Sequence, residues 1–176
     1  FQILPSGPDP AVDFSRAWFD TVMQLKPKPK SIAFVAADAE FARNLKEGAV
    51  VNAKRLGMKI TYNKNFKPGT PDFTPIIRAV NATNPDVFYV ASYPPGSAGM
   101  TRAISEVGSK VRAFGGGMVG LQFAGIMKGL GPKLNGVLNY DFYVPEPNMS
   151  LYPGVQDLLS RYQKVAPSRK VDPLGY

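Results

Sequence analysis

Short apolar runs alternate with amphipathic helical patterns along this chain of 176 residues, and this alternation limits the possible folds more than any other feature. Residues 31–36 and 87–90 form almost continuously apolar runs of strand length, as expected of strands covered on both faces. Residues 41–56 and 73–80 instead carry apolar side chains at helical spacing. The alternation predicts an α/β fold of three layers, with helices on both faces of a parallel sheet.

The remaining segments extend the same pattern. Met58, Ile60 and Tyr62 alternate with polar residues, which predicts a half-exposed strand at the edge of the sheet. Thr74 followed by Pro75 predicts a helix start with the threonine as its cap. The other expected elements are a strand at 1–4, helices at 11–25, 100–107 and 155–162, a short strand at 112–114 that runs into a glycine-rich turn, a weak helix after 119 and a strand from 136.

The chain contains no cysteine and no histidine. Thiolate nucleophiles, Ser-His-Asp machinery, zinc-finger sites and imidazole bases are therefore excluded. No paired carboxylates or activated nucleophile stand out in the predicted loops. We predict that the chain is not an enzyme, has no catalytic residues, and uses neither a metal nor a cofactor.

The formal net charge of +8 raises the question of a nucleic-acid partner. Nucleic-acid binders concentrate their basic residues on one face or arm. Here the basic residues are scattered over residues 26–30, Lys46 and Lys54 of one predicted helix, and residues 164–170. The charge therefore indicates a solvated surface, and we expect no nucleic-acid partner. No apolar stretch approaches the roughly 20 residues that span a bilayer.

In open α/β sheets, ligands bind beyond the carboxyl ends of the strands, where the strand order reverses. This rule selects the loops 37–41, 92–96, 115–119 and 140–143, which contain aromatic, glycine, serine and proline residues typical of a binding cleft. They supply Asp38, Ser92, Tyr140 and Phe142 as candidate ligand contacts. The run 115–120 also resembles a phosphate-binding loop, but it lacks the G-K-[ST] ending. A flexible turn that leaves room for the ligand is the preferred interpretation.

Several segments occur in the order of a known family's motifs. They are Asp38-Ala39-Glu40-Phe41-Ala42, Asp72-Phe73-Thr74, Asn84-Pro85-Asp86-Val87 followed by Tyr93, Met100 and Gly108, and Tyr152 and Tyr162 before the ending at 172–176. Over nearly the whole chain this series resembles the branched-chain amino-acid binding proteins of ABC importers, which have the type 1 periplasmic binding fold.

The resemblance implies the second of two α/β lobes that close around a ligand. It places residues 1–145 in this lobe, and residues 146–176 in a returning inter-lobe helix and the start of a truncated first-lobe segment. We expect a fragment that lacks the first lobe and exposes apolar surface that favours self-association. The implied function is that of a periplasmic substrate-binding component, with a small-molecule ligand and a membrane permease as partners. A ligand-sensing domain of an amide sensor or transcription regulator is the alternative, and an enzyme of the doubly wound class is a third.

Two ligand contacts carry over from the family: Phe41, an aromatic near the ligand, and Tyr93 at the second strand-end loop. Phe41 as a core residue at a helix start stays an alternative. The acid that pairs with the ligand's ammonium group in amino-acid binders falls most nearly at Gly117. Since a buried ammonium without a partner is costly, we expect an aromatic or aliphatic carboxylate or an amide, unless Asp141, Glu40 or Asp38 replaces that acid.

Overall fold

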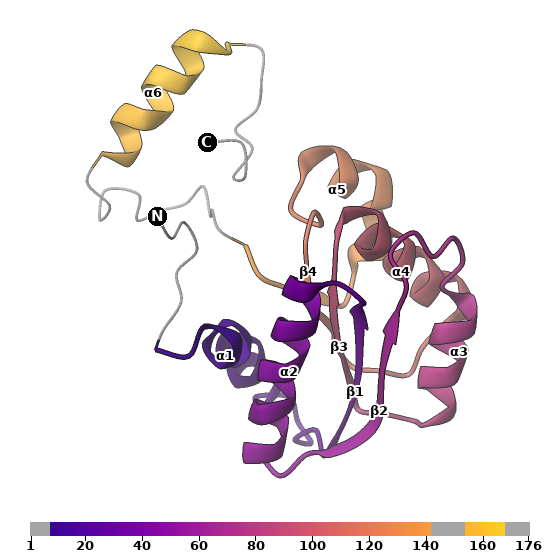
Figure 1. Cartoon of the computed structure of the whole chain (residues 1–176). Coiled ribbons are helices and arrows are strands. Elements are labelled where there is room, and N and C mark those ends of the chain that lie inside the picture. The colour runs from indigo at the N-terminus through magenta and orange to yellow at the C-terminus, as the bar shows by residue number, and fades with distance from the viewer. Residues whose placement is uncertain (1–7, 142–153, 168–176) are drawn as a thin grey trace.

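A single parallel sheet organises the chain, of which the computed structural model describes residues 8–141 and 154–167. Its strands lie in the order β2-β1-β3-β4-β5, and every neighbouring pair is parallel (Figure 1). The predicted parallel α/β architecture is confirmed. The strands are β1 (Ser31–Ala37), β2 (Lys59–Phe66), β3 (Val87–Ser92), β4 (Phe114–Met118) and β5 (Val137–Asn139).

Helices cover both faces of the sheet, as predicted. In Figure 1, α1 and α2 lie on one side of the strands, and α3 and α4 lie on the other. The helices are α1 (Pro10–Val22), α2 (Glu40–Arg55), α3 (Thr74–Ala82), α4 (Pro94–Val107), α5 (Ala124–Leu130), the 3-10 turn η1 (Gly131–Leu134) and α6 (Val155–Val165). Among the described residues, none of these helices combines the length and apolar character of a membrane span.

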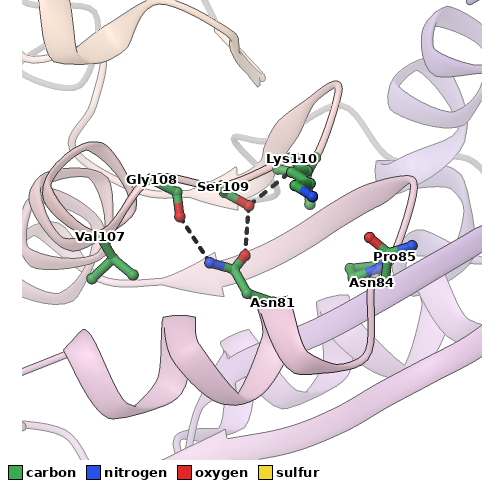
Figure 2. A pocket seen from close by; sticks show the side chains of 8 residues that line it. Asn81, Asn84, Pro85, Val107, Gly108, Ser109 and Lys110 are labelled. Carbon is green, nitrogen blue, oxygen red and sulfur yellow. Dashed lines mark hydrogen bonds between the residues drawn. The ribbon is translucent and has the colours of Figure 1, made fainter.

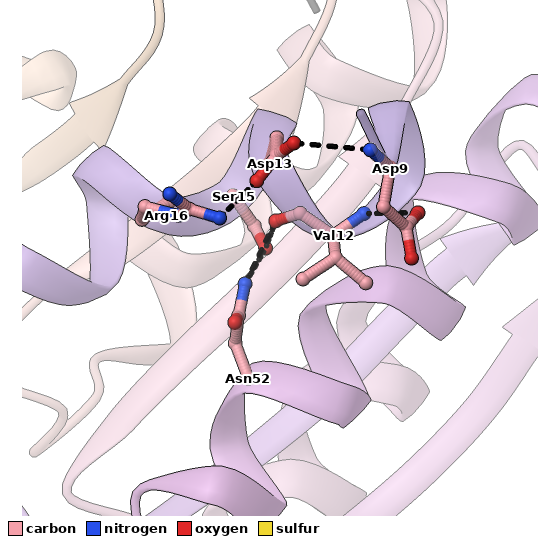
Figure 3. Close-up of polar contacts among 6 residues, drawn as sticks. All are labelled: Asp9, Val12, Asp13, Ser15, Arg16 and Asn52. Atoms are coloured by element: carbon pink, nitrogen blue, oxygen red, sulfur yellow. Dashed lines mark hydrogen bonds and ion pairs between the residues drawn. The ribbon is translucent and has the colours of Figure 1, made fainter. Parts of the chain in front are cut away.

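The close approach of α1 to α2 depends on a glycine and a buried amide. A Cβ added at Gly48 of α2 would lie 1.9 Å from the carbonyl oxygen of Ala11, so α1 can pack here only because the side chain is absent. One turn further along, the Asn52 amide donates to the Val12 carbonyl at 2.8 Å and to the Ser15 hydroxyl at 2.9 Å (Figure 3). A satisfied polar contact therefore fixes the register of the two helices.

The amino-terminal ends of β1 and β3 are joined by one carboxylate. Asp86 Oδ2 accepts hydrogen bonds from the Lys30 and Ser31 backbone N–H groups at 2.8 and 2.9 Å and from the Ser31 hydroxyl at 2.9 Å. Burial alone would raise the pKa of Asp86, but these hydrogen bonds and the charge of Arg112 lower it. The aspartate of the Asn-Pro-Asp-Val motif is thus a structural residue of the sheet.

The glycine-rich run differs from the prediction. Gly115, Gly116 and Gly117 belong to strand β4 and are buried, so the expected flexible turn is wrong. An added Cβ at Gly116 would lie 2.2 Å from the Tyr89 ring, and one at Gly115 would lie 2.2 Å from the Leu138 carbonyl oxygen. The glycines make room for neighbouring side chains and backbone within the sheet.

The predictions for the α3 cap and for Lys46 are wrong, and a predicted strand at the amino terminus is not tested. The N-cap residue of α3 is Phe73, which makes no side-chain capping bond, and Thr74 is the first residue of the helix, so the expected threonine cap is wrong. The Asp72 Oδ1 atom accepts from the Thr74 N–H at 2.8 Å. Lys46, expected on the solvated surface, is only 9% exposed and donates to Asn65 Oδ1 at 2.5 Å, and burial lowers its pKa. The strand expected at 1–4 lies outside the described residues.

Candidate functional site

The strand order reverses between β1 and β3, because β2 lies on one side of β1 while β3, β4 and β5 follow on the other. At such a point the loops that leave neighbouring strands run to opposite faces, and a crevice opens beyond their carboxyl ends. Here the switch point lies between the loop after β1, at Asp38 and Ala39, and the start of α4 after β3, at Tyr93. The predicted loops at 37–41 and 92–96 therefore meet at the switch point.

Aromatic side chains line this edge in a continuous series, which we call the aromatic row: Tyr93, Phe41, Phe14 and Tyr140. The ring centroids of Tyr93 and Phe41 lie 6.4 Å apart, those of Phe41 and Phe14 6.3 Å, and those of Phe14 and Tyr140 4.9 Å. Tyr93 is 37% exposed, and the other three are half-buried. The rings meet edge to face or tilted, and their partly exposed parts offer an apolar surface to a ligand.

Phe14 is the member of the aromatic row that the sequence did not predict as a site residue. Its helical spacing with Trp18 and Val22 indicated a core position, and it comes from α1, which precedes the first described strand. The hydrogen bond from Trp18 Nε1 to the Leu138 carbonyl, 2.9 Å long, holds α1 against β5. That docking brings Phe14 to the end of β5, beside Tyr140.

The acidic residues at this edge are exposed. Asp38 forms an ion pair with Arg43, with 3.3 Å between Oδ1 and Nη1, and its side chain is 49% exposed. Glu40, the first residue of α2, and Asp141, after β5, are also exposed. In residues 8–141 and 154–167, no aspartate or glutamate is among the buried residues.

Ser92 and Gly117 lie deeper than their predicted role requires. The Ser92 hydroxyl is buried, 2.7 Å from the Ser97 hydroxyl within α4. A Cβ at Gly117 would meet Leu45 Cδ1 at 2.8 Å, so a side chain here would point into α2. The geometry therefore favours a structural role for both residues, although their ligand contacts stay a prediction. Phe142, the last candidate, lies outside the described residues.

The ends of β4 and β5 are tied together beside the aromatic row. The Asn139 side chain accepts from the Met118 N–H and donates to the Met118 carbonyl, both at 2.9 Å. Burial raises the pKa of Tyr140, the nearby Gln122 side chain opposes this rise, and the charge of Asp141 adds to it. Tyr140 is thus a neutral phenol at neutral pH.

A small cavity of about 130 Å³ lies against the row, between Phe14, Trp18, Asn139 and Tyr140. A larger pocket of about 370 Å³ lies at the opposite edge, where Asn81 contacts Gly108 and Ser109 (Figure 2). This pocket lies at the amino ends of β3 and β4, so it is separate from the switch point. The described residues hold no cluster of acidic side chains able to bind a metal ion.

A family model described as "Periplasmic binding protein" matches residues 3–175. The chain belongs to this family. Its members are binding proteins, in agreement with the expectation that the chain is not an enzyme. No curated protein sequence gives a significant match.

Solved structures of other binding proteins and receptors share the fold. An extracellular ligand-binding receptor from Rhodopseudomonas palustris HaA2 is 17% identical, with a TM-score of 0.72, and covers 98% of this chain. A leucine-binding protein from Thermotoga maritima is 17% identical, with a TM-score of 0.71, and covers 89%. A fatty acid ABC transporter substrate-binding protein from Thermomonospora curvata is 18% identical, with a TM-score of 0.69, and covers 93%.

This member of the family spans only 52%, 43% and 41% of those solved chains, respectively. The predicted resemblance to branched-chain amino-acid binders and the type 1 fold is confirmed.

Gln122 near the aromatic row was also not predicted as a site residue. The sequence feature that could have indicated it is a single amide in the apolar stretch Leu121-Gln122-Phe123.

Proposed function

We propose that residues 1–145 form the second lobe of a periplasmic solute-binding protein, and that residues 146–176 return toward the first lobe. Family membership over residues 3–175 supports this proposal, as does coverage of about half of the solved relatives' length. The protein would take up a small organic solute between its lobes and deliver it to an ABC permease in the membrane. A ligand that contacts both lobes shifts the open–closed equilibrium toward the closed form.

The observation that carries the proposal is the aromatic row at the switch point. Tyr93 and Phe41 come from the two loops that flank the reversal of strand order, and their rings lie 6.4 Å apart. A core role alone does not account for Tyr93, which is 37% exposed. Partly exposed aromatic rings at a strand-end crevice fit an apolar solute that is covered when a second lobe closes.

The ligand class follows from the charges around the row. An amino acid's ammonium group needs a carboxylate partner once water is excluded. In the described residues no acidic side chain is buried, and the ion pair with Arg43 already engages Asp38. We therefore propose a solute without an ammonium group, namely an aromatic or aliphatic carboxylate or an amide.

A thermal-shift screen of the intact protein tests this function. Ligands that bind the native state raise the melting temperature by mass action, by an amount that grows with ligand concentration over Kd. We expect shifts with aromatic or short aliphatic acids or amides at millimolar concentration, and smaller shifts with leucine, isoleucine and valine. A larger shift with these amino acids would contradict the ligand class, and no shift with any solute would contradict solute binding.

A further inference from the structure

One buried polar side chain near the aromatic row has no structural explanation. Gln122, in the loop after β4, is 8% exposed. Neither its amide nitrogen nor its amide oxygen has a hydrogen-bond partner among the residues that the structure describes. Buried amides are almost always paired, because an unpaired one has lost its water without a replacement. By contrast, the other buried amide noted above, Asn52, makes two hydrogen bonds to α1.

The position of Gln122 connects this amide to the ligand site. β4 and β5 are neighbouring parallel strands, and Asn139 ties their carboxyl ends to Met118. Gln122 follows the end of β4, and Tyr140 follows the end of β5, where its ring packs on Phe14. Gln122 is also close enough to the Tyr140 hydroxyl to counteract the rise in the pKa of that phenol. The unpaired amide therefore lies at the Tyr140 end of the aromatic row.

We propose that Gln122 is a specificity-determining residue that binds the polar group of an aromatic ligand stacked on the aromatic row. This inference rests on the proposed function and narrows its ligand class. A carboxamide side chain presents a donor and an acceptor side by side. A neutral ligand group that also carries both, such as a carboxamide or a hydroxyl, satisfies the two atoms together. A carboxylate satisfies only the donor, and an ammonium group satisfies only the acceptor.

Benzamide, benzoate and benzylamine test this preference, because they share one ring and differ in the charge of the polar group. We expect the intact wild-type protein to bind benzamide at least about tenfold more tightly than benzylamine, with benzoate between them, as measured by calorimetric titration. In Gln122→Leu the affinity for benzamide should fall about tenfold or more, and the ranking should flatten. Gln122→Glu should shift the preference toward benzylamine.

The variant Gln24→Leu is the matched control. Gln24 is an exposed glutamine near the end of α1, and its loss should change neither the ranking nor the affinities. Because Gln122→Glu buries a charge and can impair folding, the conclusion depends on Gln122→Leu, in which leucine is close in size and shape to glutamine. Without ligand, Gln122→Leu should melt at the wild-type temperature or above it, because it removes an unpaired buried amide.

The outcomes separate this inference from the proposed function. If wild type and Gln122→Leu rank the three probes alike, or if Gln122→Leu melts several degrees lower, Gln122 has a structural role and the inference is overturned, while solute binding stands. Binding of leucine but of none of the three probes overturns the ligand class stated here and again leaves solute binding intact. Only the absence of binding for every solute in the wider screen removes the proposed function itself.

Discussion

Gly48 is the residue on which the contact between α1 and α2 most directly depends. The Ala11 carbonyl carbon and oxygen would lie 2.2 and 1.9 Å from a Cβ at this position, and backbone atoms cannot rotate away as a flexible side chain can. The contact also positions Phe14, since this residue lies on α1 one turn after Ala11. A small residue on α2 therefore supports the aromatic row at a distance.

We expect Gly48→Ala to lower the free energy of unfolding by about 1–3 kcal/mol, the range of overpacked cores, despite the better helix propensity of alanine. Urea denaturation measures this change. Gly125→Ala is the matched control, because Gly125 lies in α5 with nothing within 4 Å of an added Cβ. It should be neutral or stabilising by up to about 1 kcal/mol. Equal effects of the two substitutions would contradict the close approach at Gly48.

Burial determines the ionisation state of Tyr89. Its ring is fully buried between Trp18, Phe19 and Phe34, and its hydroxyl has no hydrogen-bond partner in the described part of the chain. Burial, with a smaller contribution from Tyr140, raises the pKa of this phenol well above its usual range. The hydroxyl is therefore neutral, and it lowers stability because it was dehydrated without compensation.

Removal of this hydroxyl should stabilise the protein. We expect Tyr89→Phe to raise the free energy of unfolding by about 1 kcal/mol, because the ring contacts stay and the unpaired polar atom is lost. The midpoint of urea unfolding should rise without a change in the slope of the transition. A lower midpoint would mean that the hydroxyl makes a stabilising contact in solution.

At the scale of the elements, Asp86 joins β1 to β3 before either strand reaches the crevice. In the folded state burial would raise the pKa of this carboxyl, but the hydrogen bonds from Lys30 and Ser31 lower it overall. A lowered folded-state pKa means that the carboxylate stabilises the fold above its unfolded pKa of about 4. That contribution is lost as the pH falls through the folded-state pKa.

Asp86→Asn should therefore cost about 1 kcal/mol at pH 7, since charged acceptors make stronger hydrogen bonds than amides. The difference from wild type should shrink as the pH falls through the lowered folded-state pKa, because the wild-type carboxyl then also becomes protonated. Urea unfolding at pH 7 and over a series of acidic pH values gives the comparison. A difference that is independent of pH would show that the carboxylate charge has no part in the stabilisation.

Strands β2 and β4 show that the neighbours of a strand determine which residues suit it. β2 has only β1 beside it, and its exposed lysines at 59 and 64 suit an edge that must not pair with another chain. β4 lies between β3 and β5, and the space beside its glycines is occupied by Tyr89, Leu45 and Leu138. A glycine-rich segment is a strand here because its neighbours supply the side chains that it lacks.

At the scale of the whole molecule, Tyr93 should affect ligand binding more than stability. Its side chain caps the accessible end of the aromatic row, and its loss leaves the packing of Phe41 against Phe14 in place. We expect Tyr93→Ala to weaken solute binding by the intact protein at least tenfold while the melting temperature changes little. Leu56→Ala is the control, because Leu56 is 43% exposed at the far end of α2. Equal losses of affinity in the two variants would contradict the proposed site.

The sequence by itself determined most of the elements and their order along the chain. Apolar runs such as 31–36 and helical spacing such as 41–56 are local signals, and the structure has β1 and α2 at these positions. It also determined which loops meet, because parallel strands place their carboxyl ends at one edge, and it brought Phe41 and Tyr93 into the candidate site.

Only the tertiary structure decided the features that depend on contacts between distant residues. Phe14 joins the aromatic row because α1 docks on β5, more than a hundred residues away in the chain. Gly117 belongs to a buried strand because Leu45 and Ala91 occupy the space beside it. Gln122 became a candidate through the lack of a hydrogen-bond partner. Periodicity reports which face of an element is apolar, whereas only the packed structure shows what that face meets.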